Sequence, residues 1–202
     1  MNINLDSCIG VPPILDFEAS SLNPQTSYPI SVGLVTNGRS YYWEIAPKPE
    51  WTDWSKESER VHGLTLEHLH AQGLPAEKVL QQVRRALNGC GAVYSDCPHW
   101  ESTWAAVLGL DLDVRDVRSI IGQHTEEDLA EYVSHAFALG GLQIHHAEGD
   151  AIALALAVSH LRALTAQVKS KEDWESFFYN GPDVTEDFER PEQGGQPLRE
   201  EL

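Results

Sequence analysis

Ile14-Leu15-Asp16-Phe17-Glu18 is the stretch of sequence that decides the fold. Its apolar residues alternate with two carboxylates, and an alternation with a period of two is typical of a β-strand. Residues i and i+2 of a strand point to the same face, about 6.5–7 Å apart, so we expect Asp16 and Glu18 to project together. Two carboxylates beside a buried strand are costly unless a cation compensates them. The pattern predicts either a metal site or an edge strand with one polar face.

The segments that follow extend this strand into a sheet. Residues 29–36 and 39–46 are predicted to be strands, joined by Asn37-Gly38, which is typical of a two-residue hairpin turn because both positions need a positive φ. Further along, we expect strands at 92–95 and 116–121, a loop at 47–57, and helices at 66–72, 76–87, 98–108, 125–137 and 150–166. Antiparallel strands followed by alternating strands and helices predict an α/β fold, with a central mixed sheet of about five strands flanked by helices.

The length predicts one domain with an appendage. The chain has 202 residues, and 42% of them are hydrophobic, which is typical of a globular protein. We expect a folded domain at 1–170 and an acidic, partly disordered extension at 171–202, with one or two helical turns at 172–179. Residues 180–202 contain seven acidic and two basic side chains and few apolar ones.

The sequence shows no pattern typical of a membrane span or a secretory signal. The longest apolar run, Ala151–Val158, has eight residues, against roughly 20 for a span. Met1–Gly10 contains neither a basic residue nor an apolar core. Cys8, Cys90 and Cys97 form no C-x-x-C pair, which argues against a zinc site or a disulfide scaffold. These features predict a cytoplasmic protein without a membrane partner.

The charge is strongly negative, with 14 Lys and Arg against 31 Asp and Glu and a formal net charge of −17. Such a surface repels phosphate backbones, so composition alone argues against a nucleic-acid partner. Arg84-Arg85 and the pair Arg115 and Arg118 are the local concentrations of positive charge, and each also fits an ordinary solvated surface.

Two further groups of residues could take part in chemistry. Asp96 follows the predicted strand 92–95, where it could cap the next helix or lie among functional groups at the carboxyl end of a strand. His145 and Asp150 stand five residues apart, and Asp150 is predicted to open the longest helix. A histidine beside an acidic metal site can act as a general base, because its pKa lies near neutral pH.

Taken together, these motifs resemble the DEDDh branch of the DnaQ-like 3′–5′ exonucleases, which have a ribonuclease H-like fold. The order is a strand D-x-E, an Asp after a later strand, and H-x-x-x-x-D at a C-terminal helix, over about residues 12–165. Val61-His62-Gly63-Leu64-Thr65 is similar to the V-H-G-I-T segment of the family. The chain departs from the family at His146, where Arg is usual, and at Ser31, where many members have Glu.

The resemblance implies phosphodiester hydrolysis with two divalent ions, Mg²⁺ or Mn²⁺. By this resemblance Asp16, Glu18 and Asp150 hold one ion, Asp16 bridges to the second, and Asp96 supports that second ion. His145 takes the proton of the attacking water, and the product is a nucleoside 5′-monophosphate released from a 3′ end. The segments implied to contact the terminal nucleotide are Ala19, Ser20, His62, Gly63, Leu64 and Thr65.

The partner expected from this resemblance is a nucleic-acid 3′ end, and the acidic surface favours a short or single-stranded one. DNA and RNA remain open, as does a homodimer. Trp51 and Trp54 could stack on bases, or pack on the sheet or at a dimer interface. Two other functions remain alternatives: a phosphodiesterase acting on dinucleotides or other small nucleotides, and a non-catalytic interaction module with the same fold.

Overall fold

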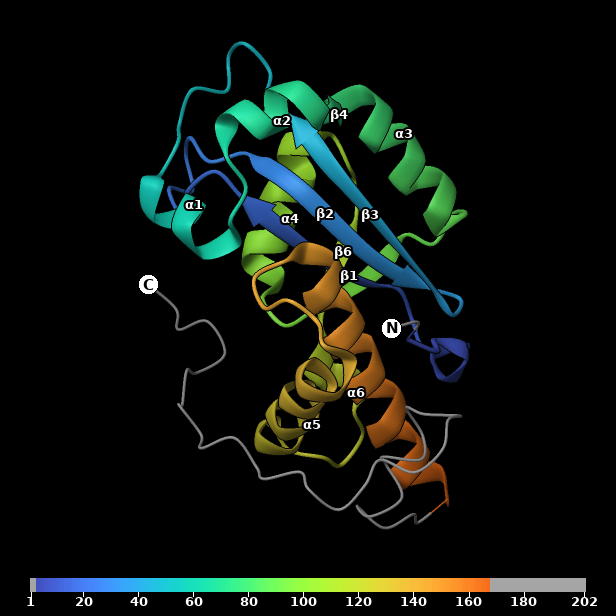
Figure 1. Cartoon of the computed structure of the whole chain (residues 1–202). Coiled ribbons are helices and arrows are strands. Elements are labelled where there is room, and N and C mark those ends of the chain that lie inside the picture. Colours follow the sequence, from blue (N-terminus) through green and yellow to red (C-terminus); the bar gives the residue numbers. More distant parts are fainter. Residues whose placement is uncertain (1–2, 168–202) are drawn as a thin grey trace.

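The computed structural model describes residues 3–167. The predicted extension 171–202, its disorder and the helical turns at 172–179 lie outside the described residues. Within them, the chain forms a six-stranded mixed sheet with helices on both faces (Figure 1). This confirms the predicted α/β class, with one strand more than expected.

The D-x-E strand lies inside the sheet, whose order is β4-β3-β2-β1-β5-β6. The strands are β1 (Ile14–Ala19), β2 (Pro29–Thr36), β3 (Arg39–Ala46), β4 (Leu74–Pro75), β5 (Ala92–Ser95) and β6 (Asp113–Asp116). Strands β1, β2 and β3 pair antiparallel, whereas β5 pairs parallel with both β1 and β6. Every residue of β1 is buried. This position rules out the alternative of an edge strand with a solvated polar face.

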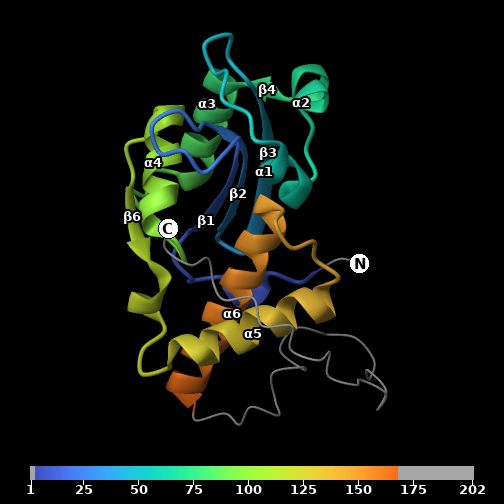
Figure 2. The ribbon, with the colours of Figure 1, turned by 90° about the vertical axis from the view of Figure 1, so that its left-hand side faces the viewer.

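Helices cover the sheet in two layers. They are α1 (Lys56–His62), α2 (Leu66–Gln72), α3 (Ala76–Leu87), α4 (Pro98–Leu108), α5 (Glu126–Gly140) and α6 (Ala147–Gln167), with short 3-10 turns η1 (Asp6–Cys8) and η2 (Val117–Ile120). Helices α3 and α4 pack on one face, and α6, backed by α5, packs on the other (Figure 2).

The strand register assigns each residue of β1 to one of these faces. Leu15 and Phe17 lie in the apolar core with α3 and α4. Asp16 pairs with Gly33 and Glu18 pairs with Ser31 on β2, so both carboxylates lie on the face that α6 covers. The predicted projection of the two acidic side chains on the same side of β1 is therefore confirmed.

Local sequence signals explain most of the element boundaries. Asn37 and Gly38 have positive φ values of 50° and 70° in the predicted hairpin turn. The side chain of Thr125 accepts a hydrogen bond from the Asp128 amide in a capping box, which fixes the start of α5. Helix α5 continues past the predicted end at residue 137 as far as Gly140, where Gly141 adopts the left-handed conformation.

The predicted strand at 116–121 is wrong. The sixth strand is Asp113–Asp116, which pairs with Ala92–Ser95, and residues 117–120 form η2 instead. The Asp116 carboxylate accepts a hydrogen bond from the Arg118 amide at 2.8 Å and thereby caps the 3-10 turn. This cap ends the strand at the residue where it was expected to begin.

Two helices also differ from the prediction. Helix α1 forms where the loop 47–57 was expected to end, because Ser55 accepts hydrogen bonds from the amides of Glu57 and Ser58 and caps it. Helix α6 begins at Ala147 rather than Asp150, and the Asp150 amide already bonds the His146 carbonyl at 2.9 Å. Asp150 therefore lies in the first turn of α6.

Helix α6 is long and apolar enough to cross a membrane by length and composition, although its uninterrupted apolar run is short. In the structure, 67% of its Ala147–Ala166 window is buried. The helix contacts β1, β2 and α5, and its buried residues form part of a hydrophobic core cluster. A core helix passes the same test, so this helix is weak evidence for a membrane span.

Candidate active site

Three carboxylates meet where the first turn of α6 crosses β1. Asp16 and Glu18 come from β1 and Asp150 from α6, and one oxygen of each lies within 4.8 Å of the others. Asp16 is 6% exposed and Glu18 is 4% exposed. Three acidic groups so close together in a buried place repel one another unless a cation compensates them. Hard carboxylate oxygens are the ligands that Mg²⁺ and Mn²⁺ prefer, so these residues fit a divalent ion.

His145 lies in the loop that leads into α6. It is half-buried, and its φ of 58° is in the left-handed region, which is rare for residues other than glycine. The backbone of this loop is held close to the helix, because a Cβ on Gly149 would clash with the Gln143 carbonyl. The unusual conformation therefore belongs to a tightly packed loop next to Asp150.

The neighbouring His146 is held by a different contact. Its ring stacks on Tyr42 of β3, with 4.4 Å between ring centroids and an angle of 29° between the planes. Burial, and after it the nearby Glu44, raises the pKa of Tyr42. His146 therefore makes an aromatic contact with the sheet.

His62 is a buried neutral histidine near His145. Burial lowers the pKa of His62 to about 4; the charge of Glu59 opposes this shift and that of His145 adds to it. The Leu64 amide donates to Nδ1 of His62 at 3.1 Å, so the proton of the neutral ring lies on Nε2. Nε2 is buried and has no hydrogen-bond partner among residues 3–167.

The other residues expected to contact a nucleotide have structural partners. Ser20 accepts a hydrogen bond from the Tyr28 amide, and Thr65 accepts one from the His68 amide as the cap of α2. Gly63 ends α1 with a φ of 75°. Ala19 ends β1, and Leu64 lies between Gly63 and Thr65. Their predicted contacts with a terminal nucleotide stay predictions.

Asp96 lies between β5 and α4, half-buried, and it does not belong to the group of three carboxylates. The sequence analysis left open that Asp96 caps the next helix, and Asp96 does not make this cap. Cys97 is the N-cap residue of α4 and makes no side-chain capping bond, while Ser95 accepts a hydrogen bond from the Cys97 amide at 2.9 Å.

Glu101 is a fourth carboxylate that the sequence analysis missed. Its side chain is fully buried on α4, and its Oε2 accepts a hydrogen bond from the Phe17 amide at 2.9 Å. Phe17 stands between Asp16 and Glu18, so Glu101 reaches the same part of β1. The signal was present: Glu101 shares its helical spacing with the buried residues Trp104, Ala105 and Leu108.

The Trp-rich loop is packed against the domain. Trp51 stacks on Tyr28 with 5.1 Å between ring centroids, and Nζ of Lys48 lies 5.1 Å from the Trp51 ring. The indole N–H of Trp54 donates to Glu59 at 2.6 Å. These contacts support the packing interpretation of both tryptophans over base stacking.

Three of the four arginines expected to provide positive charge have protein partners. Arg115 pairs with Asp113, and Arg118 pairs with Asp116 and Glu126. Arg84 donates to the Gly109 carbonyl. Pairing leaves little net positive charge at these places for phosphate groups.

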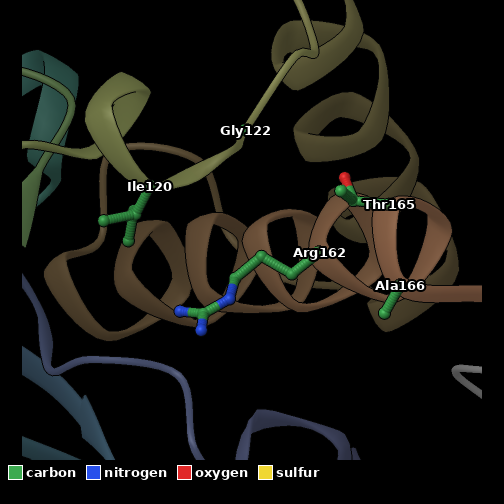
Figure 3. Close-up of a pocket in the computed structure, with 5 residues that line it drawn as sticks. All are labelled: Ile120, Gly122, Arg162, Thr165 and Ala166. Carbon is green, nitrogen blue, oxygen red and sulfur yellow. The ribbon is translucent and has the colours of Figure 1, made fainter.

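A surface hollow of about 380 Å³ lies elsewhere on the domain, between η2 and the C-terminal part of α6 (Figure 3). It is lined by Ile120, Gly122, Arg162, Thr165 and Ala166. More than three turns of α6, about 18 Å at 1.5 Å per residue, separate Arg162 from Asp150. The hollow is not part of the carboxylate site.

The six-stranded mixed sheet with helices on both faces has a ribonuclease H-like fold. No protein-family model and no curated protein sequence matches this chain. Solved structures do match it, and three of them, described next, are exonucleases. The chain has the fold of these enzymes.

One similar structure is a 3′-exonuclease that recognises the 3′ end of a histone mRNA stem-loop, with a TM-score of 0.51 and 16% identity over 77% of this chain and 81% of the other. A second is E. coli Exonuclease I with a dA16 oligonucleotide, with a TM-score of 0.53 and 11% identity over 82% of this chain. A third is Exonuclease I from Methylocaldum szegediense, with a TM-score of 0.53 and 12% identity over 81% of this chain. This chain spans 42% and 44% of the two Exonuclease I chains.

Proposed function

We propose that this protein is a metal-dependent 3′–5′ exonuclease that releases nucleoside 5′-monophosphates from single-stranded or short nucleic acid. The observation that carries the proposal is the cluster of Asp16, Glu18 and Asp150, whose oxygens lie within 4.8 Å of one another on an exonuclease fold. The same fold with apolar side chains at these places would not support it.

The carboxylates have the role of holding Mg²⁺ or Mn²⁺. Asp16, Glu18 and Asp150 would hold one ion, and Asp16 would also bridge to a second. When bound, such ions neutralise charge on the phosphoryl oxygens and orient an attacking water. His145 would accept the proton of that water as the general base, because it lies in the loop that leads into α6, the helix that carries Asp150.

Support for the second ion has two candidates. Asp96 has this role by resemblance to the family, and the structure adds Glu101. Glu101 is the stronger candidate, because it contacts the Phe17 amide between the two β1 ligands; neither Glu101 nor Asp96 belongs to the group of three carboxylates. We expect Glu101→Gln to weaken Mn²⁺ binding, measured by titration calorimetry, more than Asp96→Asn does. The reverse order would return the role to Asp96.

The substrate is held through few phosphates. The domain is acidic, and Arg115 and Arg118 are already paired with carboxylates. Exposed apolar side chains stand next to site residues in the chain: Leu22 after Ser20 and Ser21, Val61 before His62, and Ile144 before His145. These features support contact with bases at one 3′ end over a long electrostatic footprint. We also propose that the protein acts in the cytoplasm, without a membrane partner; a homodimer remains open.

The excess of acidic over basic side chains also favours a second candidate function, hydrolysis of dinucleotides or other small nucleotides. An assay with 5′-labelled single-stranded DNA, single-stranded RNA and a dinucleotide separates the two. Each is incubated with Mn²⁺, Mg²⁺ or EDTA. We expect a metal-dependent ladder that shortens from the 3′ end, absent in EDTA and with Asp16→Asn, and retained with Asp111→Asn, an exposed control.

Each other outcome of this assay has a definite meaning. Cleavage of the dinucleotide alone would support the small-nucleotide function. No cleavage of any substrate would support a non-catalytic interaction module. A ladder that Asp16→Asn leaves unchanged would show that the site is elsewhere.

A further inference from the structure

The carboxylate site depends on how closely the first turn of α6 approaches the sheet. One row of residues runs across three strands beneath this turn: Asp16 on β1 pairs with Gly33 on β2, and Gly33 pairs with Tyr42 on β3. Directly paired residues of antiparallel strands present their side chains on the same face. The row therefore faces α6 along its whole length.

Gly33 lies under the start of α6. A Cβ atom at this position would lie 2.6 Å from the Glu148 amide nitrogen and closer still to the Ala147 carbonyl. Both of these neighbours are backbone atoms, which cannot rotate away as a flexible side chain could. Any residue other than glycine would push the first turn of α6 off the sheet.

Tyr42 provides the second contact in the same row. Its ring stacks on His146, the residue immediately before α6, with 4.4 Å between centroids. The Asp150 amide bonds the His146 carbonyl, so the stacked residue is part of the first helical turn. The helix start is thus fixed both by a missing side chain at Gly33 and by an aromatic ring at Tyr42.

We propose that Gly33 and Tyr42 are positioning residues, which set the place of Asp150 and His145 relative to Asp16 and Glu18. Asp16 belongs to the same row, so a shift of the helix against the row changes the distance between the carboxylates directly. The expected effects on Mn²⁺ binding and on kcat rest on the proposed metal-dependent function, whereas the position of the helix does not. The inference therefore has a test that needs neither metal nor substrate.

The first comparison is Gly33→Ala against Gly91→Ala. A Cβ on Gly91 would meet no heavy atom within 4 Å. Both variants reduce the conformational freedom of the unfolded chain equally, so their difference reports the contact with α6. We expect Gly33→Ala to accelerate hydrogen exchange of the amides at 147–150, to weaken Mn²⁺ binding by at least about tenfold, and to lower kcat more than it raises KM. Gly91→Ala should match the wild type in all three.

The second comparison keeps the test decisive if Gly33→Ala does not fold. Tyr42→Phe retains a ring for His146, whereas Tyr42→Leu removes it. Tyr41→Leu is the matched control, because Tyr41 stacks on Trp43 and packs with the core on the α3 and α4 side of the sheet. We expect faster exchange at 147–150 and weaker Mn²⁺ binding for Tyr42→Leu, rescue by Tyr42→Phe, and loss of stability without either effect for Tyr41→Leu.

The inference is overturned if the amides at 147–150 exchange at the same rate in Gly33→Ala and Gly91→Ala. If Gly33→Ala does not fold, the inference is overturned by equal exchange rates in Tyr42→Leu and Tyr42→Phe. It is also overturned if exchange changes while Mn²⁺ binding and kcat remain those of the wild type. A wild-type protein that neither binds Mn²⁺ nor cleaves any substrate contradicts the proposed function instead. The exchange measurement still decides whether Gly33 and Tyr42 hold the helix.

Discussion

Two faces of the same three strands have opposite characters. On the face covered by α3 and α4, buried apolar residues form a continuous core: Leu15, Phe17, Val32, Leu34, Trp43 and Ile45. On the face under the start of α6, the alternating positions are polar or lack a side chain: Asp16, Glu18, Ser31, Gly33, Tyr42 and Glu44. The first face supplies hydrophobic stabilisation. The part of the other face under the start of α6 gathers charge that is costly to bury, while Ile14 and Val35 further along that face belong to the apolar core with α6. The difference shows that residues of the apolar core and residues of the proposed active site are direct neighbours along each strand, because successive side chains point to opposite faces.

The largest expected effect is on the polar face. Asp16→Asn should lower exonuclease turnover about 10,000-fold, which corresponds to about 5 kcal/mol of activation barrier. The same change should raise the thermal midpoint measured in EDTA, because it removes one of three mutually repelling carboxylates. A lower midpoint in EDTA would show that Asp16 stabilises the fold rather than the metal site.

The next effect separates the two adjacent histidines. His145→Asn should lower kcat about 1,000-fold, within the range for loss of a general base, and Asn tolerates the left-handed φ of 58° found at this position. His146→Asn is the matched change and should lower kcat about tenfold, through loss of the Tyr42 stack. If His146→Asn were the more damaging variant in single-turnover assays, the assignment of the base would be reversed.

The opposite face should respond in stability. Leu34→Ala removes a fully buried side chain from the α3 and α4 side and should lower the unfolding free energy by about 3 kcal/mol, measured by urea denaturation. Turnover at a temperature where the variant is folded should remain close to that of the wild type. A loss of turnover equal to that of Asp16→Asn would mean that the two faces are not separate.

The unfolding free energy should depend on pH through the buried side chain of His62. Its pKa is about 4 in the folded protein and near 6.5 when exposed, so between these values the unfolded chain binds more protons. The unfolding free energy should therefore fall as the pH is lowered from about 6.5 to about 4, with a contribution from His62 of at most about 3 kcal/mol. His62→Gln should flatten this part of the profile, and His70→Gln, at an exposed position, should not. Equal profiles for the two variants would show that His62 titrates as an exposed group.

The smallest expected effect concerns salt. Contact with about two phosphates of a single strand gives a slope near −1.4 in a plot of log affinity against log salt concentration. Affinity for single-stranded DNA should therefore fall only about sevenfold between 50 and 200 mM salt. A fall of 1,000-fold or more in fluorescence anisotropy titrations would reveal a basic surface that the polar face does not provide.

The sequence was sufficient for those parts of the fold that depend on local patterns. Alternation predicted β1 and the common projection of Asp16 and Glu18, and Asn37-Gly38 predicted the hairpin. The predicted bounds of α3 and α4 agree with the structure, because a proline or glycine lies near their ends and because of their apolar periodicity.

Local sequence patterns could not predict contacts between segments that are distant in the chain. The helical spacing of Glu101 signals burial, but only the structure shows that its carboxylate accepts a bond from the Phe17 amide. Gly33 looks like an ordinary strand glycine until Ala147 is seen above it. The predicted strand at 116–121 failed because the Asp116 cap outweighed the apolar character of the residues that follow.

A crystal structure grown with Mn²⁺ tests the central claim most directly. We predict an anomalous difference peak bonded by oxygens of Asp16, Glu18 and Asp150, and its loss in Asp150→Asn crystals grown in the same way. A wild-type crystal in millimolar Mn²⁺ with no peak among these three carboxylates would contradict the account.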